Sequence, residues 1–328
     1  MSVPPVAQRA DSTNQLSPEL QLIAEITAGL NAQQKIISSK FFYDSVGSDL
    51  FDQICDLPEY YPYLTEMNML PHIAGDLSQS IAQPVELVEF GAGSLTKIRI
   101  LLESIKMIES VVPIDIAHSH LQRAADKLSA DYPHVNVAPI FADFTQPVSL
   151  QNKGKNQVQL PKLGFFPGST IGNFNRDFAL TFLQRLRKTL GDSGMLLIGV
   201  DTKKSLHTLH QAYNDSAGVT AKFNLNILRH VNHIAASNFD LDAFEHYAFY
   251  NPHFGRIEMH LVSKIEQSVH INGQSITFAQ GETIHTENSY KYRPDEFVHL
   301  ARMAGWRLEQ QWLANDDMFS VFLLHADR

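Results

Sequence analysis

Apolar and polar positions in the middle of the chain follow the pattern of an α/β sheet. Apolar runs at 85–88, 163–166 and 194–200 predict buried strands, and the spacing over Phe178–Leu190 predicts a helix between the last two. Strands that alternate with helices over roughly residues 85–200 are typical of a doubly wound sheet.

The flanking segments predict further elements outside this alternation. Apolar spacing over Pro18–Leu30 predicts a helix with Ser17 as its N-cap. Residues 203–293 combine a polar helix, a segment rich in Asn and His, and alternating strand patterns such as Arg256–Val262, which is typical of a separate substrate module. Residues 297–324 predict a helix and two strands that return to the sheet.

These patterns predict two domains and a flexible arm. The sheet domain is expected at 62–200 plus 293–328 and an α+β substrate-binding domain at 18–61 plus 201–292. The polar segment 1–17 is expected to be the arm.

A glycine turn follows the first predicted strand. Gly91 and Gly93 lie between that strand and a predicted helix over 97–102. Because glycine lacks Cβ and adopts positive φ, a ligand can approach the backbone and the N-terminus of the helix here. An ordinary strand-to-helix turn explains this segment equally well when it is taken alone.

Acidic residues lie at the ends of the next two predicted strands, 111–115 and 135–144. Asp115 lies 26 residues after Glu89, near the interval of about 20 at which an acidic side chain accepts ribose hydroxyls in nucleotide-binding folds. Asp143 is suited to accept the adenine amino hydrogens, and Phe144 offers a face to the base. Loops at successive strand ends form one crevice, although a helix N-cap remains an alternative role for Asp115.

The glycine turn favours a ligand other than a dinucleotide. A G-x-G-x-x-G fingerprint needs a third glycine where Thr96 stands, which also disfavours a nicotinamide dehydrogenase. Glu89, directly before the turn, disfavours a phosphate and favours a ligand with a positive end. S-adenosylmethionine carries an ammonium and a sulfonium group, so it meets this requirement.

Composition narrows the range of partners. The 328 residues are 44% hydrophobic, with a formal charge of −9 and a pI of about 5.9, so no basic surface for nucleic acid is expected. We find no signal peptide and no apolar stretch that could cross a membrane, and therefore expect a cytoplasmic protein, here taken as a monomer. Cys55 is the only cysteine, which excludes an intramolecular disulfide.

The 15 histidines do not form a recognisable metal motif. The pairs His230 with His233 and His246 with His253 lack a signature such as H-E-x-x-H, so we expect no metal.

Longer blocks along the chain carry a more specific pattern than the glycine turn. They are FYDSVGSDLF at 42–51, LPEYYP at 57–62, FPGSTIGNF at 166–174, AYND at 212–215, GVTAKFNLN at 218–226, IEMHL at 257–261 and TENSYKY at 286–292. In this order they resemble the histidine-specific S-adenosylmethionine-dependent methyltransferases of ergothioneine biosynthesis, which trimethylate the α-amino group of L-histidine. The resemblance covers nearly the whole chain. It implies a Rossmann-like class I methyltransferase domain with a second, α+β domain, and hercynine as product.

The resemblance also implies a role for individual residues. The cofactor is expected to be held by Tyr43, Gly91, Asp115, Asp143 and Phe144.

Substrate residues are implied in the same way. Asn173 and Tyr213 are expected to bind the substrate carboxylate and help place its amine, with Tyr60 near the amine and the transferred methyl group. Asn173, Tyr213 and Tyr60 are therefore the expected catalytic residues.

The imidazole is expected to contact the last of the blocks. Glu287 and Ser289 would bind its two nitrogens, because residues two apart on a strand face the same way and a carboxylate and a hydroxyl match a donor and an acceptor. Met259 would pack beside the ring, although it alternates with apolar neighbours and fits a core position as well.

The chain departs from the family pattern near the cofactor. Ala92 stands where the family usually has serine, Glu109 where it tends to have a basic residue, and Ala117 where a hydroxyl is common. These departures affect the expected cofactor affinity more than the fold.

Two other functions fit part of the pattern. A methyltransferase of the same fold acting on another amine, such as a tryptophan derivative, would leave Glu287 without a partner. A non-catalytic sensor of S-adenosylmethionine or an amino acid would bind without methyl transfer.

Overall fold

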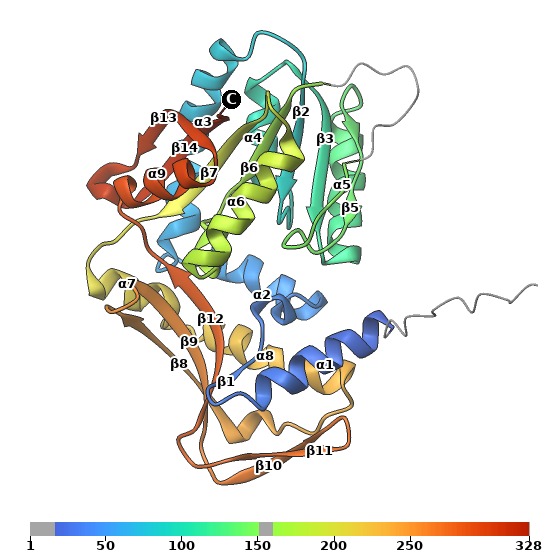
Figure 1. The fold of residues 1–328 in the computed structure, drawn as a ribbon, viewed down its shortest axis with the longest axis vertical. Coiled ribbons are helices and arrows are strands. Elements are labelled where there is room, and N and C mark those ends of the chain that lie inside the picture. The colour runs from blue at the N-terminus through green and yellow to red at the C-terminus, as the bar shows by residue number, and fades with distance from the viewer. Residues whose placement is uncertain (1–16, 151–159, 328) are drawn as a thin grey trace, which may run out of the picture.

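The computed structural model describes residues 17–150 and 160–327, so apart from Ser17 the expected arm lies outside the described residues. An eight-stranded sheet occupies the upper half of the molecule in Figure 1. Its order is β13-β14-β7-β6-β2-β3-β4, with β5 also paired to β3. The strands are β2 Val85–Phe90, β3 Ile108–Asp115, β4 Asn136–Val137, β5 Ile140–Phe141, β6 Lys162–Phe166, β7 Met195–Asp201, β13 Trp306–Leu313 and β14 Phe319–Ala326.

Helices cover both faces of this sheet. Apolar side chains of α3, α4 and α5 pack with Leu87 on one face, and those of α6 and α9 pack with Val88 on the other. This confirms the doubly wound sheet predicted from the sequence. The helices are α3 Tyr61–Ser80, α4 Thr96–Ser104, α5 His118–Asp131, α6 Arg176–Leu190 and α9 Pro294–Met303.

The direction of the strands sets where a ligand can bind. Six strands of the sheet are parallel to one another: β4, β5, β3, β2, β6 and β7. At the edge, β14 pairs with β7 in antiparallel orientation, and β13 pairs with β14 in the same way. The chain runs outward from β2 through β3 and then returns to β6 on the other side of β2. The carboxyl ends of β2 and β6 therefore flank the topological switch point, where ligands bind in open α/β sheets.

One predicted strand is divided in the structure. The segment 135–144 forms the two short strands β4 and β5, separated by Ala138 and Pro139. Proline has no N–H to give to a sheet ladder, which accounts for the interruption.

A second unit lies in the lower half of Figure 1 and contains a four-stranded sheet in the order β1-β12-β9-β8. Helix α8 packs its apolar side chains, Phe223 and Ile227 among them, into the same core as this sheet. The Asn- and His-rich segment is thus a helix. The elements are α1 Pro18–Leu30, β1 Lys35–Ile36, η1 Ser39–Phe42, α2 Ser45–Cys55, α7 Leu206–Tyr213, α8 Val219–Ile234, η3 Leu241–Ala243, β8 Phe244–Asn251, β9 Arg256–Ser263, β10 Gln267–Ile271, β11 Gln274–Phe278 and β12 Thr283–Tyr290.

Two predictions for the ends of these units are confirmed. The Ser17 hydroxyl accepts a hydrogen bond from the N–H of Leu20 and caps α1. The C-terminal segment forms α9, β13 and β14, with the short helix η4 Asn315–Asp317 between the strands. Among the described residues, none of the helices is both long enough and apolar enough to cross a membrane.

The end of β12 joins the two sheets. Just beyond this strand, Tyr292 forms a parallel bridge with Thr202, which follows β7. The backbone N–H of Tyr292 donates to the carbonyl of Asp201 at 3.0 Å. Side chains on β12 are thereby brought to the carboxyl ends of β6 and β7.

Candidate functional site

A cavity of about 300 Å³ opens at the carboxyl end of β2, and we call it the glycine-turn cavity. Gly91 and Gly93 line it together with Glu89, and so do residues of α2 and α4 and the segment after β6. Gly91 has φ +73°, and a β-carbon there would lie 3.2 Å from the ring of Phe144. Glycine is therefore required at Gly91 both by the backbone conformation and by the closeness of this ring.

Glu89 gives this cavity an acidic wall. Its side chain is 2% exposed, and its Oε2 has no hydrogen-bond partner within the described part of the chain. Burial raises the pKa of this carboxyl well above its usual value, while Lys97 acts in the opposite direction. A cationic ligand group would satisfy the free oxygen, so the residues present fit the positively charged end of S-adenosylmethionine.

Asp115 shapes the glycine turn without lining the cavity. Its Oδ2 accepts from the N–H of Gly93 at 3.0 Å, and its Oδ1 accepts from the N–H of Ala117 at 2.9 Å. Asp143 accepts from the N–H and the hydroxyl of Thr145, and it does not line the cavity either. The structure thus brings Asp115 next to the turn and Phe144 against Gly91, while Asp143 remains a predicted adenine contact.

A second cavity, of about 40 Å³, lies beside the first, and we call it the β12 cavity. Phe51, Tyr60, Gly168 and Thr170 line both cavities, so the two are adjacent. Six residues named from the sequence come together in its wall from widely separated segments: Tyr43, Tyr60, Asn173, Tyr213, Glu287 and Ser289. Tyr43, expected at the cofactor, lines only this second cavity.

Met259 does not line either cavity. It lies directly opposite Glu287 in the β9–β12 register, but its side chain is 1% exposed and belongs to the core of the second unit. The core alternative considered for Met259 therefore describes its position in this structure.

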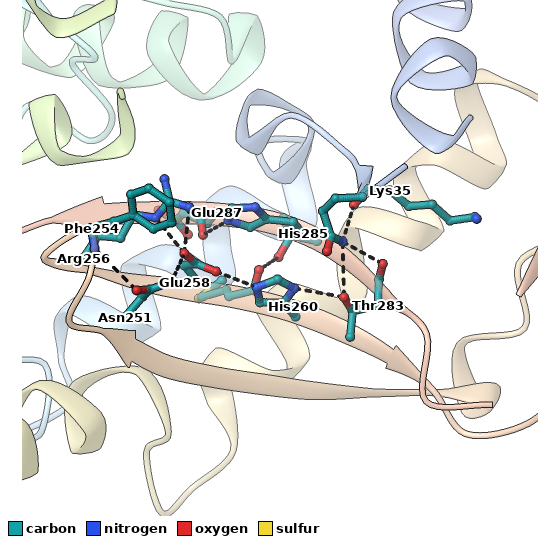
Figure 2. A network of polar contacts seen from close by, with 12 residues as sticks. Lys35, Asn251, Phe254, Arg256, Glu258, His260, Thr283, His285 and Glu287 are labelled. Atoms are coloured by element: carbon teal, nitrogen blue, oxygen red, sulfur yellow. Dashed lines mark hydrogen bonds and ion pairs between the residues drawn. The ribbon is translucent and has the colours of Figure 1, made fainter. Parts of the chain in front are cut away.

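A β-bulge positions Glu287. The register of β12 against β9 shifts between His285 and Glu287, so Thr286 is an extra residue in the strand. The Thr286 hydroxyl donates to Asn224 of α8 at 2.7 Å, and the ring Nε2 of His285 donates to the carbonyl of Glu287 at 3.0 Å. The bulge turns His285 to the face of the sheet that carries Glu258 and His260, which we call the outer face (Figure 2), while Glu287 lines the cavity.

The outer network contains a trio that has the spacing of a metal site. Ligand atoms of Glu258, His260 and His285 lie within 4.8 Å of one another. The Glu258 carboxylate already accepts from Arg256 at 2.8 Å and from Nε2 of His260 at 3.1 Å (Figure 2). The two imidazole rings are stacked, with 12° between their planes, so their in-plane lone pairs do not converge on one point. This geometry favours a hydrogen-bonded network that supports the bulge.

Burial controls the protonation of the groups in the β12 cavity. It raises the pKa of the hydroxyls of Tyr43 and Tyr60 well above the usual value, and it also raises that of Tyr213. The Glu287 carboxyl has its pKa raised to about 7 by burial, although Lys291 and a hydrogen bond from Asn173 lower it. The tyrosines therefore remain protonated at neutral pH, whereas Glu287 titrates there.

Residues that the sequence did not single out complete the wall. Asp201 and Lys291 line the β12 cavity, and their side chains form an ion pair at 2.6 Å. Asp201 ends β7, as Asp115 ends β3, and Lys291 continues the two-residue spacing of Glu287 and Ser289. The acidic strand end and the two-residue spacing are both visible in the sequence and could have identified these residues.

Comparison with known proteins identifies relatives along nearly the full chain. A family model described as "Histidine-specific methyltransferase, SAM-dependent" matches residues 22–326. The histidine N-alpha-methyltransferase of Mycolicibacterium smegmatis is 38% identical over 293 residues, covering 88% of this chain and 89% of the relative. That of Mycobacterium tuberculosis is 36% identical over 309 residues, covering 93% and 94%. Ergothioneine biosynthesis protein 1 of Schizosaccharomyces pombe is 26% identical over 88% of this chain, which spans 38% of that longer protein.

Proposed function

Because this chain belongs to the family of histidine-specific, S-adenosylmethionine-dependent methyltransferases, we propose that it trimethylates the α-amino group of L-histidine to give hercynine. The single observation that carries the substrate is the pair Glu287 and Ser289 in the wall of the β12 cavity. This cavity adjoins the glycine-turn cavity, where the residues fit S-adenosylmethionine.

The imidazole ring is the proposed partner of this pair. A neutral imidazole has one N–H donor and one nitrogen acceptor. An ionised Glu287 accepts from the N–H, and the Ser289 hydroxyl donates to the other nitrogen. Indole has an N–H that could pair with Glu287, which corrects the expectation that a tryptophan derivative would leave Glu287 without a partner. It has no acceptor nitrogen for the Ser289 hydroxyl, so it would match only half of the pair.

The proposed cofactor residues lie around the glycine turn. Glu89 would accept from the ammonium group, and Asp115 from the ribose hydroxyls with its remaining lone pairs. Phe144 and Asp143 would contact the adenine. S-adenosylmethionine supplies an electrophilic methyl group, and the protein's contribution is to hold the amine in line with it.

Positioning therefore provides most of the proposed catalysis. Tyr213 and Asn173 would bind the carboxylate while Glu287 and Ser289 bind the ring, so the substrate is held at both ends. Such remote contacts fix the amine at near-attack distance, which is one of the largest contributions that an enzyme can make to a bimolecular transfer. Tyr60 lines both cavities, and we assign its hydroxyl to the amine at their junction.

Proton removal constrains the role of Tyr60. The amine attacks only in its neutral form, so the nitrogen must lose one proton before each of the three methyl transfers. Since burial raises the pKa of Tyr60 well above its usual value, its hydroxyl is protonated at neutral pH and serves as an acceptor or relay. Its ring also offers a face that stabilises a methylated cation by about 0.5–2 kcal/mol.

A panel reaction tests this function. The purified protein is incubated with S-adenosylmethionine and an equimolar mixture of the twenty amino acids and dimethylallyltryptophan. Mass spectrometry then identifies the products by their masses. A gain of three methyl groups on histidine alone is the expected result. Methylation of another amine would overturn the substrate, and binding of the cofactor without any transfer would favour a sensor.

Other properties are proposed from the sequence pattern. We assign the methyltransferase domain to 62–200 plus 293–328 and the substrate-binding domain to 18–61 plus 201–292, a division that the separate eight-stranded and four-stranded sheets support. A cytoplasmic monomer that binds no nucleic acid or metal remains a prediction.

A further inference from the structure

A buried lysine forms part of the wall of the β12 cavity. Lys291 is 1% exposed, and its Nζ donates to Ser289 Oγ at 2.7 Å, to the Tyr213 hydroxyl at 3.1 Å and to Asp201 Oδ2 at 2.6 Å. An ammonium group has three N–H donors, and these three acceptors use all of them. Lys291 therefore acts on a ligand only through the two hydroxyls.

A second lysine holds the same carboxylate from the other side. Lys204 Nζ donates to Asp201 Oδ1, to the carbonyl of Thr202 at 2.6 Å and to the Tyr61 hydroxyl at 2.9 Å. Asp201 also accepts from Tyr61 at 2.7 Å, so its two oxygens are fully engaged. Two lysines thus share one carboxylate, and the trio carries one more positive than negative charge.

The surplus charge is directed toward the cavity at Tyr213. Apart from Asp201, the partners of Lys204 do not line the cavity, whereas Lys291 contacts the two hydroxyls that do. Buried charge is stabilised by an opposite charge or by hydrogen bonds. The carboxyl of Glu287 lines the same cavity, but in the proposed complex it is engaged by the ring N–H of histidine.

Tyr213 can transmit this charge. A hydroxyl that accepts a hydrogen bond from an ammonium group becomes a stronger donor, because hydrogen bonds in a chain polarise one another. In the structure the Tyr213 hydroxyl donates to Ser289 Oγ at 2.7 Å. A substrate carboxylate is a stronger hydrogen-bond acceptor than a serine hydroxyl, so the Tyr213 hydroxyl would donate to it instead. Lys291 would continue to donate to the Tyr213 oxygen.

We propose that Lys291, held by Asp201, is the positioning residue that stabilises the α-carboxylate of the substrate through the Tyr213 hydroxyl. The proposal rests on histidine being the substrate. It predicts that selectivity for an amino acid over the corresponding carboxylate-free amine depends on Lys291.

Binding of two ligands to matched variants tests the proposal. Calorimetry with S-adenosylhomocysteine present measures the Kd of histidine and of histamine, which has the ring and the amine but no carboxylate. For Lys291→Met, we expect histidine to bind at least about tenfold more weakly while the Kd of histamine changes less than about threefold. Asp201 keeps Lys204, Tyr61 and Thr202 as partners in this variant, which supports its folding.

Lys204→Met is the matched control. It removes the same charge from the trio but no contact to Tyr213 or Ser289, so the ratio of the histidine and histamine Kd values should stay within about threefold of wild type. Tyr213→Phe should reduce the preference for histidine as Lys291→Met does, and combining the two should reduce it little further. If Lys291→Met fails to fold, Tyr213→Phe decides the test. A ratio of histidine and histamine Kd values equal to that of wild type in this variant would overturn the proposal.

The outcomes separate this proposal from the proposed function. If wild type binds no histidine, the proposed substrate is wrong. If wild type binds histidine but Lys291→Met weakens histidine and histamine equally, or weakens neither, Lys291 has only a structural role and the inference is overturned.

Discussion

Asp115 at the end of β3 accepts a hydrogen bond from the backbone N–H of Gly93 at 3.0 Å and so fixes the glycine turn that follows β2. Its other oxygen accepts from the N–H of Ala117 at 2.9 Å, so one carboxylate braces two strand ends. Each carboxylate oxygen has more than one lone pair and can still accept from a ribose hydroxyl. The residue expected to bind the ribose thus also builds the turn.

Asp115→Ala should therefore weaken cofactor binding through both effects. We expect the Kd of S-adenosylhomocysteine to rise by at least about tenfold, because two charged hydrogen bonds to the ribose and the ordered turn are lost. Calorimetry measures this change. Asp131→Ala, which removes an exposed ion pair with Arg99, is the control and should leave the Kd unchanged. Unaltered affinity in Asp115→Ala would show that the ribose binds elsewhere.

A comparison of Gly91→Ala with Gly273→Ala should separate the effect of backbone strain from the loss of space for the cofactor. A β-carbon at Gly91 would meet the Phe144 ring at 3.2 Å, whereas at Gly273 it would meet nothing within 4 Å, and both residues have positive φ, +73° and +72°. Each substitution should cost about 1 kcal/mol of unfolding free energy from the strained conformation. Only Gly91→Ala should also weaken S-adenosylhomocysteine binding, which titration by tryptophan fluorescence or calorimetry would detect. Equal affinities in the two variants would contradict the assignment of the glycine-turn cavity.

The buried Glu287 carboxyl should make stability depend on pH. Its pKa is raised from 4.5 to about 7 in the folded protein, with burial as the main cause. At a pH below the pKa of Glu287 in the unfolded chain, the carboxyl is protonated in both states and does not reduce stability. As the pH rises through its pKa in the folded protein, the native state must bury a charge, which lowers the free energy of unfolding by up to about 3 kcal/mol.

Glu287→Gln removes this titration. In the ligand-free protein, the variant should gain unfolding free energy relative to wild type between pH 5 and pH 8, as measured by urea denaturation at both values. A difference between the two proteins that does not change with pH would contradict the raised pKa.

Tyr60→Phe should affect transfer more than binding. The variant keeps the aromatic face but loses the hydroxyl that we assign to the amine, so kcat for histidine methylation should fall by about 10–100-fold with a smaller change in KM. Steady-state kinetics measures both constants. Tyr63→Phe is a useful control, since Tyr63 lines only the glycine-turn cavity. A larger effect on KM than on kcat would make Tyr60 a binding residue instead.

Periodicity predicted the fold well because the buried strands of a parallel sheet are nearly continuous apolar runs. The strands β2, β6 and β7 and the helices α1 and α6 match their predicted segments closely. Pro139 interrupts the segment that was expected to be one strand. The helix α8 was missed because its asparagines and histidines obscure the apolar stripe of Phe223, Ile227 and Val231.

The candidate site was predicted in part for a similar reason. Two-residue spacing on β12 placed Glu287 and Ser289 on one face, and the structure brings both into the wall of one cavity. The same spacing points to Lys291, but a lysine in a strand usually reaches solvent, and only the fold shows that Asp201 lies beside it. The bulge at Thr286 depends on contacts with α8 and β9, which local sequence does not encode.

The position of the methyl groups on the product tests the central claim most directly. Purified protein is incubated with L-histidine and excess S-adenosylmethionine, and the product is examined by nuclear magnetic resonance and mass spectrometry. We expect three equivalent methyl groups on the α-nitrogen and none on the ring, because Glu287 and Ser289 engage both ring nitrogens. Methylation of a ring nitrogen, or no methylation of histidine under conditions where the cofactor binds, would contradict the account.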